Sequence, residues 1–202
     1  MPRTPLISLA LLAALAATNA HAEGFKATVG YENVNPKSNN GQLAGAEANV
    51  SDDWGFTGSL GYNFDDNWSA DVWTGLTKFK HEVGIAGLGT VANVEHRPTT
   101  LTVNYHFMPA EKFSPYVGIG YGWVNVSGEE GVGALAGTQV RASNANGLTY
   151  VLGADVAVTD NVFIRGSVRK LDFDSDVTVN GAAVGTANVD PLVYGISAGF
   201  KF

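Results

Sequence analysis

Three histidines that follow the first 22 residues are the side chains best suited to catalysis or metal binding: His81, His96 and His106. A lipid hydrolase would need a serine, a histidine and a carboxylate at one depth. His81 and His96 fall at the bases of loops, and His106 points to the polar side of its segment, without such partners. We therefore expect no enzyme activity. A metal site across His81 and His96 is the weaker alternative to solvated histidines, and we expect no cofactor and no metal.

Charged residues form a second group, on the polar face of segments whose other face is apolar. They are Lys26, Asp71, Asp155, Arg165 and Lys201. Asp155 and Arg165 lie symmetrically about a turn near Asp160, which predicts a direct cross-strand pair. Because a buried charge needs a partner, we expect these residues to form a neutral plug at one end of the fold. An ion-conducting path is the alternative.

Eight segments with an apolar residue at every second position would carry these side chains. They begin near residues 24, 54, 68, 101, 117, 148, 162 and 192, and a period of two predicts β-strands. The connections after the second, fourth and sixth segments are short, and the other four are long and rich in Gly, Asn, Ser and Ala. Short turns at one end and long loops at the other are the layout of an outer-membrane β-barrel.

Composition and the first residues agree with export to a membrane. Arg3 precedes a short apolar run and the motif Ala20-His21-Ala22, which predicts a signal peptide over 1–22 and one barrel domain over 23–202. The formal charge of -7 argues against a nucleic-acid partner, and the lack of cysteine excludes disulfides.

The expected fold is an all-β, eight-stranded antiparallel transmembrane barrel of the outer membrane, surrounded by lipid and lipopolysaccharide and monomeric. Hydrocarbon requires every backbone polar group to be paired, so the sheet must close. A soluble lipocalin-like barrel is the alternative, but Gly118, Gly120 and Gly122 suit a crowded lumen better than a wet surface. Phe202, on an amphipathic last segment, looks like the signal read by the barrel assembly machinery.

Four blocks, KFKHEVG, VEHRPTTLTVNYHF, KFSPYVGIGYGW and VDPLVYGISAGFKF, resemble the OmpW family of small outer-membrane barrels. The resemblance implies an apolar channel entered from outside and uptake of small hydrophobic molecules, as in the related AlkL proteins. Some members serve as bacteriocin receptors. A receptor or adhesin that acts through its loops is the alternative, although these loops lack the aromatic residues typical of binding hot spots.

Several lumen-facing residues are apolar where a porin would be polar. We expect Trp73, Phe79, Val124, Val151, Leu171 and Val193 to line an apolar funnel, as a small hydrophobic ligand requires; simple packing of a narrow barrel is the alternative for Trp73. Arg169 stands where the resemblance implies an aromatic residue, which would shift ligand preference toward polar or anionic groups. Pro98 cannot donate to a ladder, so we expect it to open a lateral gate; ending the strand pairing near a loop is the alternative.

Overall fold

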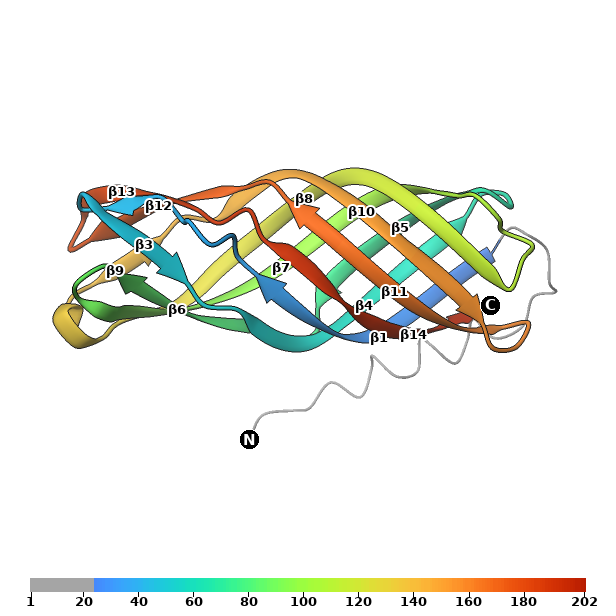
Figure 1. The fold of residues 1–202 in the computed structure, drawn as a ribbon, viewed down its shortest axis with the longest axis horizontal. Helices are drawn as coiled ribbons and strands as arrows, with labels where there is room; N and C mark the ends of the chain where they lie inside the picture. Colours follow the sequence, from blue (N-terminus) through green and yellow to red (C-terminus); the bar gives the residue numbers. More distant parts are fainter. Residues whose placement is uncertain (1–23) are drawn as a thin grey trace, which may run out of the picture.

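The computed structural model describes residues 24–202, which form a long antiparallel β-barrel (Figure 1). Eight strands close it in this order: β1 (Gly24–Asn35), β4 (Asp53–Asn63), β5 (Trp68–Gly75), β7 (Gly89–His106), β8 (Phe113–Gly131), β10 (Ala145–Ala157), β11 (Val162–Leu171) and β14 (Leu192–Lys201). The last strand pairs with the first from Lys26↔Lys201 to Asn35↔Leu192, so no edge is left open. The predicted eight-stranded barrel is confirmed. The predicted signal peptide lies outside the described residues, among which no helix is long and apolar enough to span a membrane.

The outside of this barrel carries an apolar band bounded by aromatic rings. Ile196 and Leu60 are 65% and 61% exposed, which suits a surface that faces lipid. Tyr31 and Trp54 stack at the outer level with ring centroids 5.3 Å apart. Trp68 and Tyr105 meet edge to face at the level of the short turns, 5.0 Å apart. Two such girdles are typical of transmembrane barrels.

The four long connections carry strands of their own, which the periodicity did not predict. They contain β2 (Gln42–Leu43), β3 (Ala46–Val50), β6 (Phe79–Ile85), β9 (Val140–Ala142), β12 (Asp174–Val179) and β13 (Ala182–Asn188), with a 3-10 turn at Gly133–Leu135. Together with the far ends of β7 and β8 they form what we call the outer extension, at the end of the molecule away from the C-terminus (Figure 1). A hydrogen bond of 2.7 Å from Ala44 N to Val184 O links its two sheets.

The outer extension reverses the chemistry of the membrane barrel without a change of side-chain direction. Along β7 the inward side chains are polar in the membrane barrel and mostly apolar in the outer extension: Thr100, Thr102, Asn104 and His106, then Ala92, Val94 and His96. The outward side chains change in the opposite sense, from Leu101, Val103 and Tyr105 to Asn93, Glu95 and Arg97. The change falls next to Trp123 of the outer girdle, which pairs with Thr99. The barrel therefore has a polar interior inside the membrane and an apolar interior outside it.

A charge network fills the membrane barrel near its short turns. Asp155 faces Arg165 in register, and the guanidinium donates to both carboxylate oxygens at 2.7 and 2.8 Å. Asp71 accepts a further bond from Arg165 at 3.2 Å and an ion pair from Lys26 at 3.2 Å. The four residues are at most 6% exposed and sum to zero charge. Lys201 lies at the mouth of the barrel, 5.8 Å from the Phe163 ring.

Gly120 tests how closely the lumen is packed. A Cβ there would overlap the carbonyl oxygen of Leu101 and lie 2.7 Å from Thr102 Cα, and backbone atoms of a ladder cannot move aside. We expect Gly120→Ala to lower the free energy of unfolding by about 1–3 kcal/mol or to prevent refolding into lipid vesicles. Gly166→Ala, whose Cβ would meet nothing within 4 Å, is the control. Equal urea midpoints for the two variants would contradict this packing.

Arg165 tests the network. Arg165→Met leaves Asp71 and Asp155 buried with only Lys26 to balance them, so we expect a loss of about 3–5 kcal/mol of unfolding free energy. The measurement is urea unfolding from lipid vesicles followed by tryptophan fluorescence. Lys201→Met, at the partly exposed mouth, should cost less than about 1 kcal/mol. A loss for Arg165→Met as small as this control would refute the structural role of the network.

Candidate functional site

An apolar cluster marks the junction between the membrane barrel and the outer extension. It consists of Val34, Trp73, Phe79, Val124, Ala145, Leu171, Phe173 and Val193. Five of the six residues expected in the funnel meet here, and each is at most 3% exposed. Val151 does not join them, because it pairs with Gly118 and Arg169 one layer deeper. The cluster forms the floor of the space above it.

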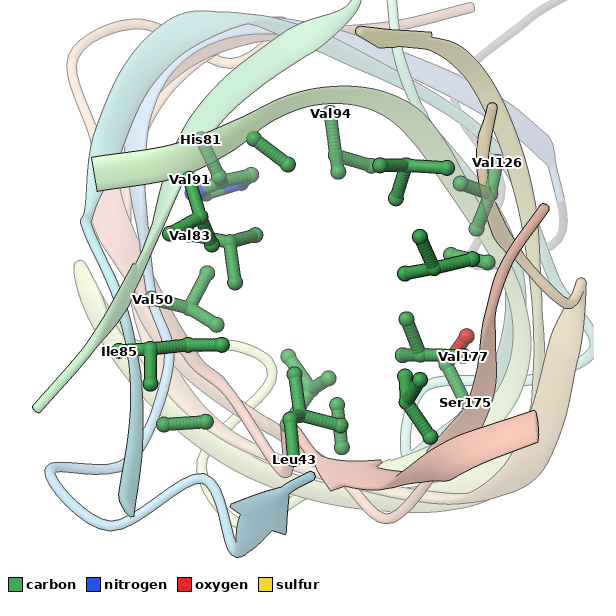
Figure 2. Close-up of a pocket in the computed structure, with 18 of the residues that line it drawn as sticks. Leu43, Val50, His81, Val83, Ile85, Val91, Val94, Val126, Ser175 and Val177 are labelled. Atoms are coloured by element: carbon green, nitrogen blue, oxygen red, sulfur yellow. The ribbon is translucent and has the colours of Figure 1, made fainter. Parts of the chain in front are cut away.

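Above this floor the outer extension encloses a cavity of about 250 Å³, which we call the outer cavity (Figure 2). Aliphatic side chains point into it from every strand of the extension: Leu43 of β2, Val50 of β3, Val83 of β6, Val94 of β7, Val126 of β8, Val140 of β9, Val177 of β12 and Val184 of β13. Of the expected funnel residues only Val124 lines it. The wall consists almost entirely of carbon, as a site for a small apolar ligand requires.

Sequence reasoning missed most of this wall because it lies in the glycine-rich connections. A signal was nevertheless present in two hairpin turns. Asn180 and Gly181 have φ of 51° and 81° between β12 and β13, and Ala44 and Gly45 have the same values between β2 and β3. Asn-Gly between alternating valines and alanines is a strong sign of a tight hairpin.

Two histidines of the wall hide their nitrogens from the cavity. His81 Nδ1 lies 2.5 Å from the carbonyl oxygen of Ser51, so this nitrogen carries a proton. In the neutral ring Nε2 is then the acceptor, and it accepts from His96 Nε2 at 2.7 Å. His96 Nδ1 is thereby left as a buried acceptor, and no donor among residues 24–202 reaches it. The pair is held in its neutral form.

The remaining polar side chain of the wall is also occupied, since Ser175 Oγ donates to Ser143 O at 2.8 Å. Because the unpaired Nδ1 of His96 is buried away from the cavity, a ligand hydroxyl or carboxylate would find no accessible partner and would lose its hydration. An apolar cavity of roughly 150 Å³ stays dry and binds benzene, so the outer cavity has room for somewhat larger apolar molecules. In the described part of the chain no three potential metal ligands come together, so the His81–His96 pair stands alone.

Arg169 lies beneath the floor and does not line the outer cavity. Its guanidinium stacks 4.8 Å from the Trp73 ring and donates to Thr100 Oγ1 at 2.9 Å. Glu32, 3% exposed, supplies an opposite charge nearby. This polar layer and the charge network below it separate the outer cavity from the periplasmic end.

Pro98 lies where the wall of the barrel is interrupted. The β5–β7 ladder ends at Thr74↔Thr99, and the β6–β7 ladder begins at Phe79↔His96. The chain between β5 and β6 turns toward β4 instead, since Leu76 N and Thr77 N both bond to Phe56 O.

The missing N–H of Pro98 faces this interruption. Thr74 Oγ1 donates to Pro98 O at 3.1 Å, and the N and O of one strand residue point to the same side. On its other side Pro98 pairs with Val124 in a ladder that is continuous from Glu95 to His106. Phe79 and His96, at the floor and wall of the outer cavity, flank the inner side of the gap.

The histidine pair predicts loss of stability in acid. Burial lowers the pKa of His96 from 6.5 to about 3, and burial also lowers the pKa of His81. The unfolded chain then binds the proton first, so stability is full above pH 6.5 and falls as the pH drops toward 3. At pH 5 we expect His96 to cost roughly 2 kcal/mol relative to pH 8. Urea unfolding across this range should show a shallower pH slope for His96→Phe; an unchanged slope would contradict the assignment.

Comparisons with known proteins show the family to which this chain belongs. Residues 16–202 match the model of the OmpW family. Outer membrane protein W of Vibrio cholerae is 30% identical over 216 residues, covering 98% of both chains. Outer membrane protein AlkL of Ectopseudomonas oleovorans is 29% identical, covering 88% of this chain and 78% of that protein.

A solved structure has the same architecture. The outer membrane protein OprG from Pseudomonas aeruginosa superposes with a TM-score of 0.79 and 27% identity, covering 91% of this chain and 98% of the other. The barrel fold, the apolar band on its surface and the outer-membrane relatives together place the protein in the outer membrane. The chain belongs to the OmpW family of outer-membrane β-barrel proteins.

Proposed function

We propose that this protein is a passive uptake channel for small hydrophobic molecules, which enter the outer cavity from outside and leave sideways into the membrane beside Pro98. The observation that carries the proposal is the carbon-lined outer cavity in a section of barrel whose outer surface is polar. Such a section offers an apolar solute a site beyond the lipid, where the polar layer of lipopolysaccharide would otherwise delay it.

The interior below the cavity argues against passage straight through the barrel. The floor, the Arg169–Glu32 layer and the network of Lys26, Asp71, Asp155 and Arg165 follow one another. An apolar solute that crossed them would have to separate buried charges from their partners. A side exit above this region avoids that cost.

The interruption between β5 and β6 is suited to be the exit. It lies at the level of the floor, beside Phe79 and His96, and its outer side opens next to Leu76, which is 52% exposed on the lipid-facing surface. Because the ladder is already broken there, a solute has fewer backbone hydrogen bonds to disrupt than elsewhere on the wall. Pro98 has no backbone N–H, so one hydrogen bond that could close the gap cannot form there.

Filling the outer cavity tests the uptake site. Val126→Trp places a large side chain in the cavity, whereas Asn125→Trp places the same side chain on the exposed face of β8. We expect cells with Val126→Trp to take up a labelled medium-chain alkane about tenfold more slowly than cells with the unaltered protein. A filled cavity would cost the alkane about 1–2 kcal/mol of apolar contact, which corresponds to roughly a tenfold change. Cells with Asn125→Trp should match the unaltered protein, and uptake of a small sugar should not change in either case.

No difference in alkane uptake between cells with and without the protein would refute the transport function. The exposed surface of the outer extension would then become the place to look for a receptor role.

Pro98→Val tests the exit separately from the cavity. The variant restores an N–H on the side of the gap and favours its closure. We expect slower alkane uptake with unchanged binding of a fluorescent apolar probe by the purified protein. Pro115→Val, near the start of β8 at the short-turn end of the barrel, is the control. Unchanged uptake by Pro98→Val would contradict the side exit and leave the cavity intact.

A further inference from the structure

A cluster of basic residues lies on the outer surface of the barrel beside the interrupted ladder. Lys78, Lys80 and Arg97 are exposed around the carboxylate of Glu95, and a second carboxylate, that of Asp53, accepts a hydrogen bond from Lys80 N at 2.7 Å. The ammonium groups of Lys78 and Lys80 lie 3.1 and 3.3 Å from the two oxygens of Glu95. We call Lys78, Lys80, Glu95 and Arg97 the basic rim. We propose that the basic rim binds the phosphate group of an outer-leaflet lipid, an interaction that places one lipid against the gap in the barrel wall.

The four residues converge because of their register. Lys80 pairs directly with Glu95, Lys78 immediately precedes β6, and Arg97 lies two residues beyond Glu95 on the outer face of β7. Hydrogen bonds from Lys78 and then Lys80 lower the pKa of Glu95, so its carboxylate stays ionised and holds both lysines in place. Each ammonium still has donors to spare. Their side chains are 45% and 75% exposed, so those donors are accessible.

The charge of the basic rim fits a phosphate. The three cations, set against Glu95 and the neighbouring Asp53, leave an excess of one positive charge, on a protein whose formal charge is -7. A phosphate monoester carries up to two negative charges and several acceptor oxygens, and lysine and arginine are its usual partners. Glu82 lies farther from the lipid-facing band and is bonded by Thr90 Oγ1, so a group approaching from the membrane meets the cations first.

The height of the basic rim matches the lipid headgroups. Arg97 pairs with Asn125, two residues beyond Trp123 of the outer girdle. Two residues of a strand tilted by about 40° rise roughly 5 Å along the membrane normal. The headgroup layer occupies about 5–7 Å outside the hydrocarbon on each side. The acyl chains of a lipid held there would extend past Leu76 and Leu101, on the two sides of the interruption.

Other lysines at a similar height do not offer such a site. Lys37 is bound to Asp190 at 2.7 Å. Lys170 donates to Asp190 O at 2.6 Å and lies 3.6 Å from Asp172. Two cations and two acids cancel there, so the excess of charge is specific to the face of β6 and β7.

The test is binding of lipid A to the purified full-length protein in detergent, measured by native mass spectrometry. The probes are lipid A with two phosphates and the same lipid after dephosphorylation. We expect the phosphorylated form to bind at least about tenfold more tightly, with an affinity that falls as salt increases. Equal retention of both forms would overturn the proposal.

Paired variants locate the site. Lys80→Gln/Arg97→Gln removes two charges from the basic rim and leaves the Lys78–Glu95 pair to hold the strands. Lys112→Gln/Arg141→Gln removes two charges from the opposite ends of the molecule. We expect the first to weaken binding about 30-fold and the second by less than about twofold. Equal losses would overturn the assignment, as would displacement of the lipid by millimolar inorganic phosphate, which would indicate a site for soluble anions.

This outcome is independent of transport. Lipid binding is measured without any solute, so it can fail while alkane uptake stands, and uptake can fail while the lipid site stands.

Discussion

The requirement that every backbone polar group in hydrocarbon be paired within the protein governs the rest of this structure. It forces β1 onto β14 and so closes eight strands into a narrow cylinder. In so narrow a lumen, glycines such as Gly120 are needed where another strand passes close by, and charged side chains can be accommodated only with partners. The Asp155–Arg165–Asp71–Lys26 network is therefore a consequence of closure. It also leaves an apolar solute no inexpensive route along the axis.

Outside the hydrocarbon the same strands obey the opposite rule. The outer surface of β7 and β8 faces water and headgroups, so Arg97 and Glu95 replace Leu101 and Val103 there, while the interior becomes aliphatic. The interrupted ladder lies at the outer edge of the hydrocarbon, where headgroups and water can pair with backbone groups that the middle of the membrane would leave unpaired. The gap at Pro98, the outer cavity and the basic rim all lie at this change of environment, which is where a solute, a lipid headgroup and the protein would meet.

The histidine pair illustrates how the outer cavity is kept apolar. Val, Leu and Ala alone would give a carbon wall, yet His81 and His96 occupy two of its positions. They satisfy each other and Ser51 rather than a ligand, and the remaining nitrogen of His96 stays buried. The cavity thus carries polar residues without offering a polar contact, and acid is the condition under which this arrangement becomes costly.

The alternation of apolar residues in the sequence was sufficient to predict the eight strands, their lipid-facing side chains and the opposition of Asp155 and Arg165, because a strand in lipid has a strict period of two. The expected funnel residues Trp73, Phe79 and Leu171 were correctly placed on the inward face for the same reason. The sequence could not reveal that they form a floor, since the cavity above them is built from short strands in four separate glycine-rich connections. Whether those connections stay loose or assemble depends on contacts such as Ala44 with Val184, between residues far apart in the chain. Only the tertiary structure decides this, because the aliphatic side chains of the connections are buried by one another and not by lipid.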